Sequence, residues 1–337
     1  MRIVSLVPEG APSSLYRSII PMQALAVSGH RVHVEERNAV GDAGPLLDVD
    51  AVHLFRLSHQ PARRLVRQLR DAGVAVVYDN DFDAGSAPAG HAVARAMRGL
   101  GGQQAVASEA AMVRLADVVV APTGELGDRF LRAGASDVQI IENWLPPTFT
   151  RPRTVPGRGI TVGWAAMAEH LWDFDALGMR EVLAELLTRH QHVRLLAIGA
   201  DLGMTSPRYE FQPWQPYDAL PALLARCDIA IAPLADVPFN QTRSNVKLKE
   251  YAAVGVPWLA SPVGDYAWMG EQHGGRLVPD GGWAAELNAL VRDDQARSRL
   301  GVAGLGWARR EVVLDHVGEL EQLFEHAVAV ARDVRRR

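Results

Sequence analysis

The feature of this sequence that most constrains its fold is a repeated alternation of short apolar runs with amphipathic segments. Short apolar runs predict strands buried on both faces, and apolar residues at helical spacing predict the helices that cover them. In the first part of the chain, the predicted strands lie at residues 3–7, 31–34, 51–55, 74–78, 117–121 and 138–141. The predicted helices lie at residues 14–28, 61–72 and 124–133. Strands that alternate with helices favour a parallel sheet in an α/β domain.

The same alternation starts again after a segment that is rich in proline. Residues 144–159 contain four prolines and two glycines without periodicity, which is typical of a linker. Beyond this segment, strands are predicted at 160–164, 193–199, 228–232 and 258–260, and helices at 173–189, 217–226 and 283–291. We therefore predict two doubly wound, Rossmann-like α/β domains that face each other across a cleft. The predicted division is an N-terminal domain at 1–145, a linker at 146–158, a C-terminal domain at 159–305 and a helical segment at 306–337.

Composition excludes several other classes of protein. Hydrophobic residues make up 48% of the chain and charged residues 22%, which argues against long disordered regions. The net charge of −4 gives no sign of a nucleic-acid partner. The single cysteine, Cys227, excludes an internal disulfide, and no apolar run approaches the ~20 residues of a membrane-spanning helix. We expect a cytoplasmic protein without an integral membrane segment.

Residues 242–260 carry the strongest functional signal, and they are typical of a loop, a short helix, a turn and a strand. Ser244 or Asn245 is expected to cap the helix, because a short side-chain oxygen accepts from free N–H groups in the first turn. Gly255 is expected to end the helix, and Pro257 prevents it from continuing. The mouth of such a helix suits an anion, because unpaired N–H groups and the positive end of the helix dipole point there.

Charged side chains around this helix strengthen the signal. Arg243 stands just before the helix and Lys247 one turn in, while Glu250 lies within roughly 60° of Lys247 on the same face. Cations near the helix start suit a nucleotide diphosphate, and the carboxylate suits the ribose hydroxyls. The same helical arithmetic places Lys249 about 160° from Lys247, so Lys249 is predicted to be solvated. From these residues alone, a surface ion pair between Lys247 and Glu250 is an equally open interpretation.

Residues 244–257, continued by residues 260–266, resemble the donor-site helix of retaining nucleotide-sugar glycosyltransferases with the GT-B fold (glycosyl transferases group 1, family 4-like). The resemblance implies metal-independent transfer, with a nucleotide sugar as co-substrate and no further cofactor. It also implies that the last helix crosses back onto the N-terminal domain. It further implies that Glu250 binds the donor ribose and that Gly163, at the entry to the C-terminal domain, belongs to the donor-binding site.

The sequence departs from this family pattern at two places. Thr242 stands where the family has a second glutamate near the donor sugar, and residues 164–170 lack the Arg and Lys that many relatives use for the diphosphate. The remaining candidates for diphosphate binding are Arg243, Ser244, Asn245 and Lys247, with His170 as an additional candidate. Trp214 either flanks the nucleotide base or fills the core.

Three carboxylates, Asp79, Asp81 and Asp83, follow directly after a predicted strand. Three interpretations stay open: a solvated loop, a site for a divalent metal, or an acceptor-side site in which Asp79 or Asp81 binds or deprotonates the hydroxyl. The carboxyl ends of parallel strands are where α/β proteins bind ligands. Tyr16 and Arg17, in the helix after the first strand, are expected on the same acceptor side.

We therefore predict a glycosyltransferase that moves a hexose from a nucleotide-diphosphate sugar to a hydroxyl acceptor with retained configuration. The acceptor is a glycan, lipid, protein or small molecule, and the catalytic candidates are Asp79, Asp81 and His170. One alternative, motivated by Thr242, is a weakly active or inactive subunit that binds a nucleotide sugar and supports a partner enzyme. Another alternative is a nucleotide-sugar epimerase with the same fold.

Overall fold

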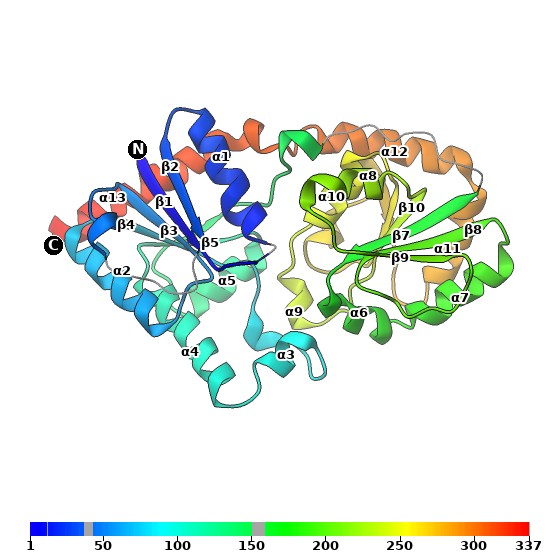
Figure 1. Ribbon diagram of the computed structural model, residues 1–337, viewed down its shortest axis with the longest axis horizontal. Coiled ribbons are helices and arrows are strands. Elements are labelled where there is room, and N and C mark those ends of the chain that lie inside the picture. The colour runs from blue at the N-terminus through cyan, green and yellow to red at the C-terminus, as the bar shows by residue number, and fades with distance from the viewer. Residues whose placement is uncertain (12, 37–42, 150–158, 337) are drawn as a thin grey trace.

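The computed structural model describes residues 1–11, 13–36, 43–149 and 159–336, and it contains two six-stranded parallel sheets (Figure 1). The first sheet has the strand order β2-β1-β3-β4-β5-β6, and the second has the order β12-β11-β10-β7-β8-β9. Both orders are those of doubly wound sheets, in which the chain steps outward from a starting strand in both directions and helices cover both faces. The predicted fold class, two doubly wound α/β domains, is confirmed.

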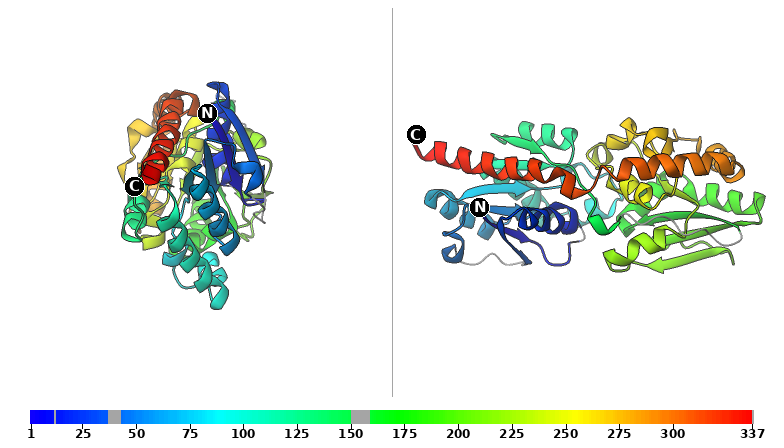
Figure 2. Two further views of the ribbon diagram at one scale, coloured as in Figure 1. Left: turned by 90° about the vertical axis from the view of Figure 1, so that its left-hand side faces the viewer. Right: turned by 90° about the horizontal axis from the view of Figure 1, so that it is seen from above.

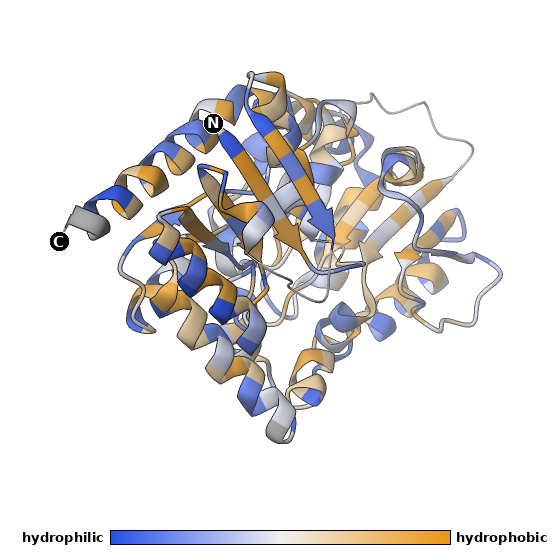
Figure 3. Cartoon of the chain, turned by 60° about the vertical axis from the view of Figure 1, so that its left-hand side comes forward, coloured by the Kyte–Doolittle hydropathy of each residue, from blue (hydrophilic) through white to orange (hydrophobic). Residues whose placement is uncertain are grey.

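The strands of the N-terminal domain are buried because their residues are almost continuously apolar. β3 and β4 are buried at every residue, whereas the edge strand β2 alternates between hydrophilic and hydrophobic residues (Figure 3). The strands are β1 (Arg2–Val7), β2 (Arg31–Glu36), β3 (Ala51–Phe55), β4 (Ala75–Asp79), β5 (Val118–Ala121) and β6 (Val138–Ile140). The helices are the π-helical turn η1 (Leu15–Ile19), α1 (Ile20–Val27), α2 (Gln60–Ala72), α3 (Ala92–Ala96), α4 (Leu100–Leu115) and α5 (Gly124–Arg132).

The C-terminal domain repeats this organisation. Its strands are β7 (Ile160–Ala166), β8 (Val193–Gly199), β9 (Tyr209–Pro213), β10 (Ile229–Ala232), β11 (Trp258–Ala260) and β12 (Gly275–Leu277). Its helices include η5 (Ala168–His170), α6 (Leu171–Ala176), α7 (Met179–Arg189), α8 (Leu220–Leu224), α9 (Pro238–Gln241), α10 (Val246–Ala253), α11 (Trp283–Arg292) and α12 (Asp294–Ala308). None of the helices in the described ranges has the length and apolarity needed to cross a membrane.

The chain passes between the two domains twice, and the two passages are hydrogen-bonded to each other. Leu145 N–H donates to Glu311 O at 2.8 Å, and Val313 N–H donates to Leu145 O at 2.9 Å. The last helix, α13 (Val317–Arg336), then lies along the N-terminal domain, as Figures 1 and 2 show. Its Glu321 carboxylate accepts from the Ser28 hydroxyl at 2.7 Å. An apolar cluster that includes Trp144, Leu145 and Trp307 continues through both domains, so the domains share a core at their junction.

Several elements differ from those predicted. The helix α4 has small residues and two glycines, Gly101 and Gly102, in place of an apolar stripe, and the predictions do not include it. The short strands β9 and β12 are also absent from the predictions. The helix predicted at 173–189 is interrupted at Gly178, whose φ of +61° is in the left-handed region. Of the predicted linker, residues 150–158 lie outside the described residues.

Candidate active site

A cavity of about 290 Å³, here called the interdomain pocket, is lined by residues from both domains. Arg56, Asp81 and Met167 come shortly after β3, β4 and β7, so the pocket lies at the carboxyl ends of strands from both sheets. The predicted site residues in its lining are Tyr16, Asp81, His170, Trp214, Arg243, Ser244, Lys247 and Glu250. The predicted site residues outside its lining are Arg17, Asp79, Gly163 and Asn245.

The N-terminus of helix α10 points toward this pocket. The prediction that a side chain caps this helix is wrong. Asn245 occupies the N-cap position and makes no side-chain capping bond. The side chain of Ser244 is engaged elsewhere, since its hydroxyl accepts from Asn143 Nδ2 at 2.8 Å. The helix ends at Ala253, and Gly255 follows with a φ of +71°. The first turn of α10 therefore has no side-chain oxygen on its N–H groups, which leaves room for an anion.

Two opposite charges of α10 meet in the pocket. Glu250 is 9% exposed, and its carboxylate accepts a hydrogen bond from the Tyr16 hydroxyl of the other domain. Burial raises the pKa of Glu250 to about 7, although Tyr16 and Lys247 act in the opposite direction. Burial also lowers the pKa of Lys247 to about 8, with Glu250 opposing that shift. The surface-pair interpretation of Lys247 and Glu250 is therefore wrong, because Glu250 is buried and its hydrogen-bond partner is Tyr16.

Arg243 and His170 line the pocket close to Lys247. The Arg243 guanidinium lies 4.7 Å from the centre of the Phe239 ring and 3.7 Å from a Glu169 carboxylate oxygen, and its Nε is buried without a hydrogen-bond partner. His170 Nδ1 lies 3.4 Å from Asp173 Oδ2. Burial, followed by the nearby Lys247 and Arg243, holds the pKa of His170 well below its ordinary value. His170 is therefore uncharged at pH 7, and burial together with the two nearby cations makes its ring a weak base.

Beneath the pocket, Arg17 and Asp79 form a buried ion pair. Arg17 donates from Nε and from a terminal nitrogen to the two oxygens of Asp79, each at 3.0 Å, and His53 Nε2 lies 3.3 Å from Asp79 Oδ2. Burial alone raises the pKa of Asp79, but Arg17 and His53 outweigh it, so the net pKa is lowered. Asp79 is 3% exposed, so the solvated-loop interpretation is wrong for this residue. Asp79 does not line the interdomain pocket, and a direct catalytic role for this residue stays a prediction.

The other two carboxylates of this segment have separate arginine partners. Asp81 faces the interdomain pocket and accepts from Arg56 Nε at 2.6 Å. Asp83 accepts from Arg129 at 2.6 Å and from Gly85 N–H at 3.0 Å. Across the described part of the chain, no three His, Cys, Asp or Glu residues are grouped so as to hold a metal ion. Among the three carboxylates, Asp81 is the one that lines the interdomain pocket.

Trp214 and Gly163 have different surroundings. Trp214 is 38% exposed and lines the pocket, so it does not fill the core. Its place beside a nucleotide base stays a prediction. Gly163 lies within β7, where an added Cβ would overlap the Cys227 sulfur. We attribute the glycine to this close packing between β7 and the buried Cys227.

Lys249 is the clearest error of the sequence analysis. It was predicted to be solvated, but it is 0% exposed. Its Nζ lies 2.8 Å from Glu142, 2.7 Å from Glu311 and 3.0 Å from the Asn143 carbonyl oxygen. These partners belong to the two passages between the domains, so Lys249 attaches α10 to both of them. Helical geometry gives only the direction of a side chain and does not show what covers it.

Sequence reasoning also missed several residues of the pocket. Tyr217 contacts the Tyr16 hydroxyl with its own, and burial raises its pKa far above the ordinary value. Asn143 lines the pocket and bridges Arg17 and Ser244. Arg56 lines it as well. These residues come from segments that are far apart in the sequence, and no local pattern marks them.

Residues 175–293 match the family model described as Glycosyl transferases group 1. No curated protein matches the sequence. Among solved structures, sucrose-phosphate synthase from Thermosynechococcus elongatus has a TM-score of 0.70 at 15% identity, over 98% of this chain and 100% of that chain. Anabaena HepE in complex with UDP and glucose has a TM-score of 0.66 at 16% identity, over 98% and 99%. A putative UDP-N-acetylglucosamine 2-epimerase from Listeria monocytogenes has a TM-score of 0.57 at 12% identity, over 97% and 98%.

The structural similarities extend over nearly the whole chain and establish its fold. The family match covers the segment that contains Arg243, Lys247 and Glu250, the charged residues around α10. The resemblance noted in the sequence is therefore confirmed. Residues 175–293 are thus similar to the glycosyl transferases group 1 family, within a chain that has a two-domain GT-B fold.

Proposed function

We propose that this protein transfers a hexose from a nucleotide-diphosphate sugar to a hydroxyl acceptor, with retention of the anomeric configuration. The observation that carries the proposal is the convergence of Arg243, Lys247 and Glu250 in one pocket between the domains. A half-buried ammonium, a nearby guanidinium and a helix N-terminus without a side-chain cap form a site for a diphosphate. The desolvated Glu250 carboxylate, one turn further along α10, is placed to accept from ribose hydroxyls.

The remaining site residues take roles that follow from their positions. Ser244 and Asn245 stand at the helix mouth beside the diphosphate, and Trp214 stands at the exposed edge of the pocket, where a base would stack. HepE has been solved with UDP, which makes UDP the first nucleotide to test here.

In the reaction, the bond between the anomeric carbon and the diphosphate oxygen breaks, and a bond from that carbon to the acceptor oxygen forms. Lys247 and Arg243 stabilise the charge that develops on the leaving diphosphate. The acceptor proton passes to a base, for which Asp81 and the neutral His170 are the candidates that line the pocket. Tyr16, on the acceptor side, must release Glu250 before a ribose occupies its place.

The test is a binding panel of nucleoside diphosphates and their sugars, by thermal shift with calorimetric follow-up. A ligand at 100 times its Kd adds about 2.7 kcal/mol of stability, which is easily measured. We expect one nucleoside diphosphate to bind and Glu250→Gln to weaken it. The exposed Glu325→Gln is the matched control and should bind like the wild type. Unchanged affinity in Glu250→Gln would show that the ribose assignment is wrong.

A second candidate is a subunit that binds a nucleotide sugar without transferring it. Thr242 is 0% exposed and its hydroxyl donates to the Phe239 carbonyl at 2.8 Å, so this position offers no carboxylate to a donor sugar. Donor hydrolysis or transfer by the purified chain alone would exclude this candidate. The structural similarity to a putative epimerase adds a third, which would convert the donor sugar without any acceptor. Product analysis by nuclear magnetic resonance separates conversion from transfer.

A further inference from the structure

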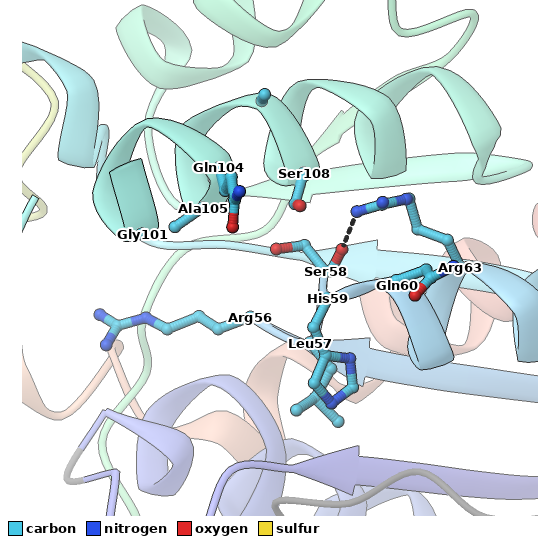
Figure 4. A pocket seen from close by; sticks show the side chains of 11 residues that line it. Arg56, Leu57, Ser58, His59, Gln60, Arg63, Gly101, Gln104, Ala105 and Ser108 are labelled. Atoms are coloured by element: carbon cyan, nitrogen blue, oxygen red, sulfur yellow. Dashed lines mark hydrogen bonds between the residues drawn. The ribbon is translucent and has the colours of Figure 1, made fainter. Parts of the chain in front are cut away.

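A second cavity, of about 710 Å³, opens in the N-terminal domain, and Figure 4 shows the side chains that line it. One wall is the segment after β3, residues 56–60, together with Arg63 of α2. The opposite wall is one side of α4, with Gln104 and Ser108. We call this space the α2–α4 cavity. Its volume is that of a small-molecule site.

The charges of the α2–α4 cavity are all of one sign. Arg56 and Arg63 line it, and no Asp or Glu is present among the described residues of its walls. Arg63 donates to the Ser58 carbonyl at 2.7 Å, and within the described chain it forms no ion pair with a carboxylate. A guanidinium carries five N–H donors, so most of those of Arg63 are available to a ligand. Gln104 and Ser108 add uncharged hydrogen-bonding groups opposite it (Figure 4).

The helix α2 begins at this cavity with an unusual arrangement of charge. Its first turn contains no acidic residue, and Arg63 follows at the positive end of the helix dipole. A cation near a helix N-terminus is unfavourable, because it stands against the positive end of the dipole. The N–H of Ala62 in this first turn already donates to the His59 ring at 3.2 Å, so the contact for an anion here is the Arg63 side chain.

Arg56 connects the α2–α4 cavity with the interdomain pocket, because its side chain lines both. Its guanidinium is held by Asp81 and lies 4.2 Å from the centre of the Phe82 ring. Its backbone has a φ of +54°, and no other non-glycine residue in the described chain has a positive φ. Such a conformation costs roughly 1–2 kcal/mol and is found preferentially at functional sites.

We infer that the α2–α4 cavity binds an anionic group of the acceptor, a phosphate or a carboxylate, while the acceptor's hydroxyl reaches the interdomain pocket past Arg56. The inference rests on the proposed function, since it names the class of acceptor for the same transfer. Arg63 is the anion contact, and Arg56 stands between this group and the reacting hydroxyl. A neutral acceptor would form no ion pair with either guanidinium group of the cavity.

The test uses three probes with one carbon skeleton: glucose, glucose 6-phosphate and glucuronate. Their binding is measured by calorimetry on the full chain and on Arg63→Gln, in which an amide replaces the charge. The matched control is Arg64→Gln, which removes the same charge from an exposed position of α2 outside the cavity. Lys247→Met provides a second control, because it removes a cation from the donor side alone. Arg63→Lys keeps the charge and shows whether a loss in Arg63→Gln is electrostatic.

We expect at least one of the two anionic probes to bind more tightly than glucose, and the comparison between them identifies phosphate or carboxylate. Arg63→Gln should weaken that binding by about tenfold or more, because a charge-assisted hydrogen bond is lost. Arg63→Lys should retain part of it, and Arg64→Gln and Lys247→Met should retain all of it. Unfolding temperatures of all variants are recorded so that a misfolded protein is recognised.

Three results would overturn the inference: equal binding of glucose and its charged analogues, no saturable binding of either anionic probe, or equal losses in Arg63→Gln and Arg64→Gln. Loss of probe binding in Lys247→Met would do the same, by assigning the anion to the donor side. Failure of the proposed function has a different signature. In that case, no nucleoside diphosphate binds, although the anionic probes still bind through Arg63.

Discussion

Lys247 and Lys249 are the only lysines of this sequence, and both lie on α10. The two side chains have different environments. Lys247 faces the interdomain pocket, whereas Lys249 is buried against the two passages between the domains. We therefore expect Lys249→Met to destabilise the protein and Lys247→Met to reduce nucleotide binding. Methionine nearly preserves the volume of the side chain, so the comparison isolates the charge.

The loss of unfolding free energy expected for Lys249→Met follows from how exposed the partners of Lys249 are. The Glu142 side chain is 50% exposed, so its charge is screened and the pair contributes at most about 1 kcal/mol. The Glu311 side chain is 18% exposed, and the Asn143 carbonyl also loses its donor, which together cost about 2 kcal/mol. The sum is about 3 kcal/mol, below the upper end for a fully buried pair. With an unfolding entropy of about 2.1 cal/mol/K per residue, this lowers Tm by about 4 °C.

The assay combines calorimetric unfolding with nucleoside diphosphate titration for both variants. Lys247 carries a lowered pKa because of its burial, so removing its charge recovers a desolvation cost and should change Tm little. Its diphosphate affinity should fall by about tenfold or more. Within the buried cluster, Glu311→Gln should cost more stability than Glu142→Gln, because Glu311 is less exposed. Equal Tm values for Lys249→Met and the wild type would refute the reasoning.

Three further predictions concern two residues of the interdomain pocket and the packing of β7. Burial raises the pKa of Glu250 to about 7, so its contribution to stability is present below about pH 4.5 and lost as pH rises through 7. Nucleotide affinity should rise over the same interval as the carboxylate ionises, and Glu250→Gln should remove that rise; a pH-independent wild type contradicts this. Tyr16→Phe should tighten nucleotide binding about fivefold at pH 8, because the ribose no longer displaces a phenol of the other domain. Weaker binding would instead assign Tyr16 to the donor complex. Gly163→Ala should destabilise the protein by roughly 1–3 kcal/mol through overlap with Cys227. The double variant Gly163→Ala, Cys227→Ala should recover part of that loss, and no recovery would point to another cause.

The site shows where sequence patterns are informative and where they are not. Arg243, Lys247 and Glu250 lie within eight consecutive residues, and a short helix brings them together by itself, so local spacing was sufficient to predict their convergence. Lys249 belongs to the same helix but was misjudged, because its environment consists of Glu142 and Glu311, which lie far from it in the sequence.

The carboxylates after β4 give a second example. The sequence placed Asp79, Asp81 and Asp83 at the carboxyl end of a strand, which is correct, but left three interpretations open. The structure separates them, because each has its own arginine partner and only Asp81 lines the interdomain pocket. The positions of those arginines depend on strand order and loop direction. The alternation of side chains along a strand does not predict either of these.

The sequence by itself determined the two parallel sheets, the helix α10 with its stop at Gly255, and the grouping of charged residues around that helix. These features depend on contacts between neighbouring residues and on the requirement that apolar runs be buried. Only the tertiary structure decided that Tyr16 reaches Glu250, 234 positions away, and that Arg56 lies between two cavities. The physical reason is that side-chain environment is set by whatever segment packs against it, and in a chain of two facing domains that segment is usually distant in sequence.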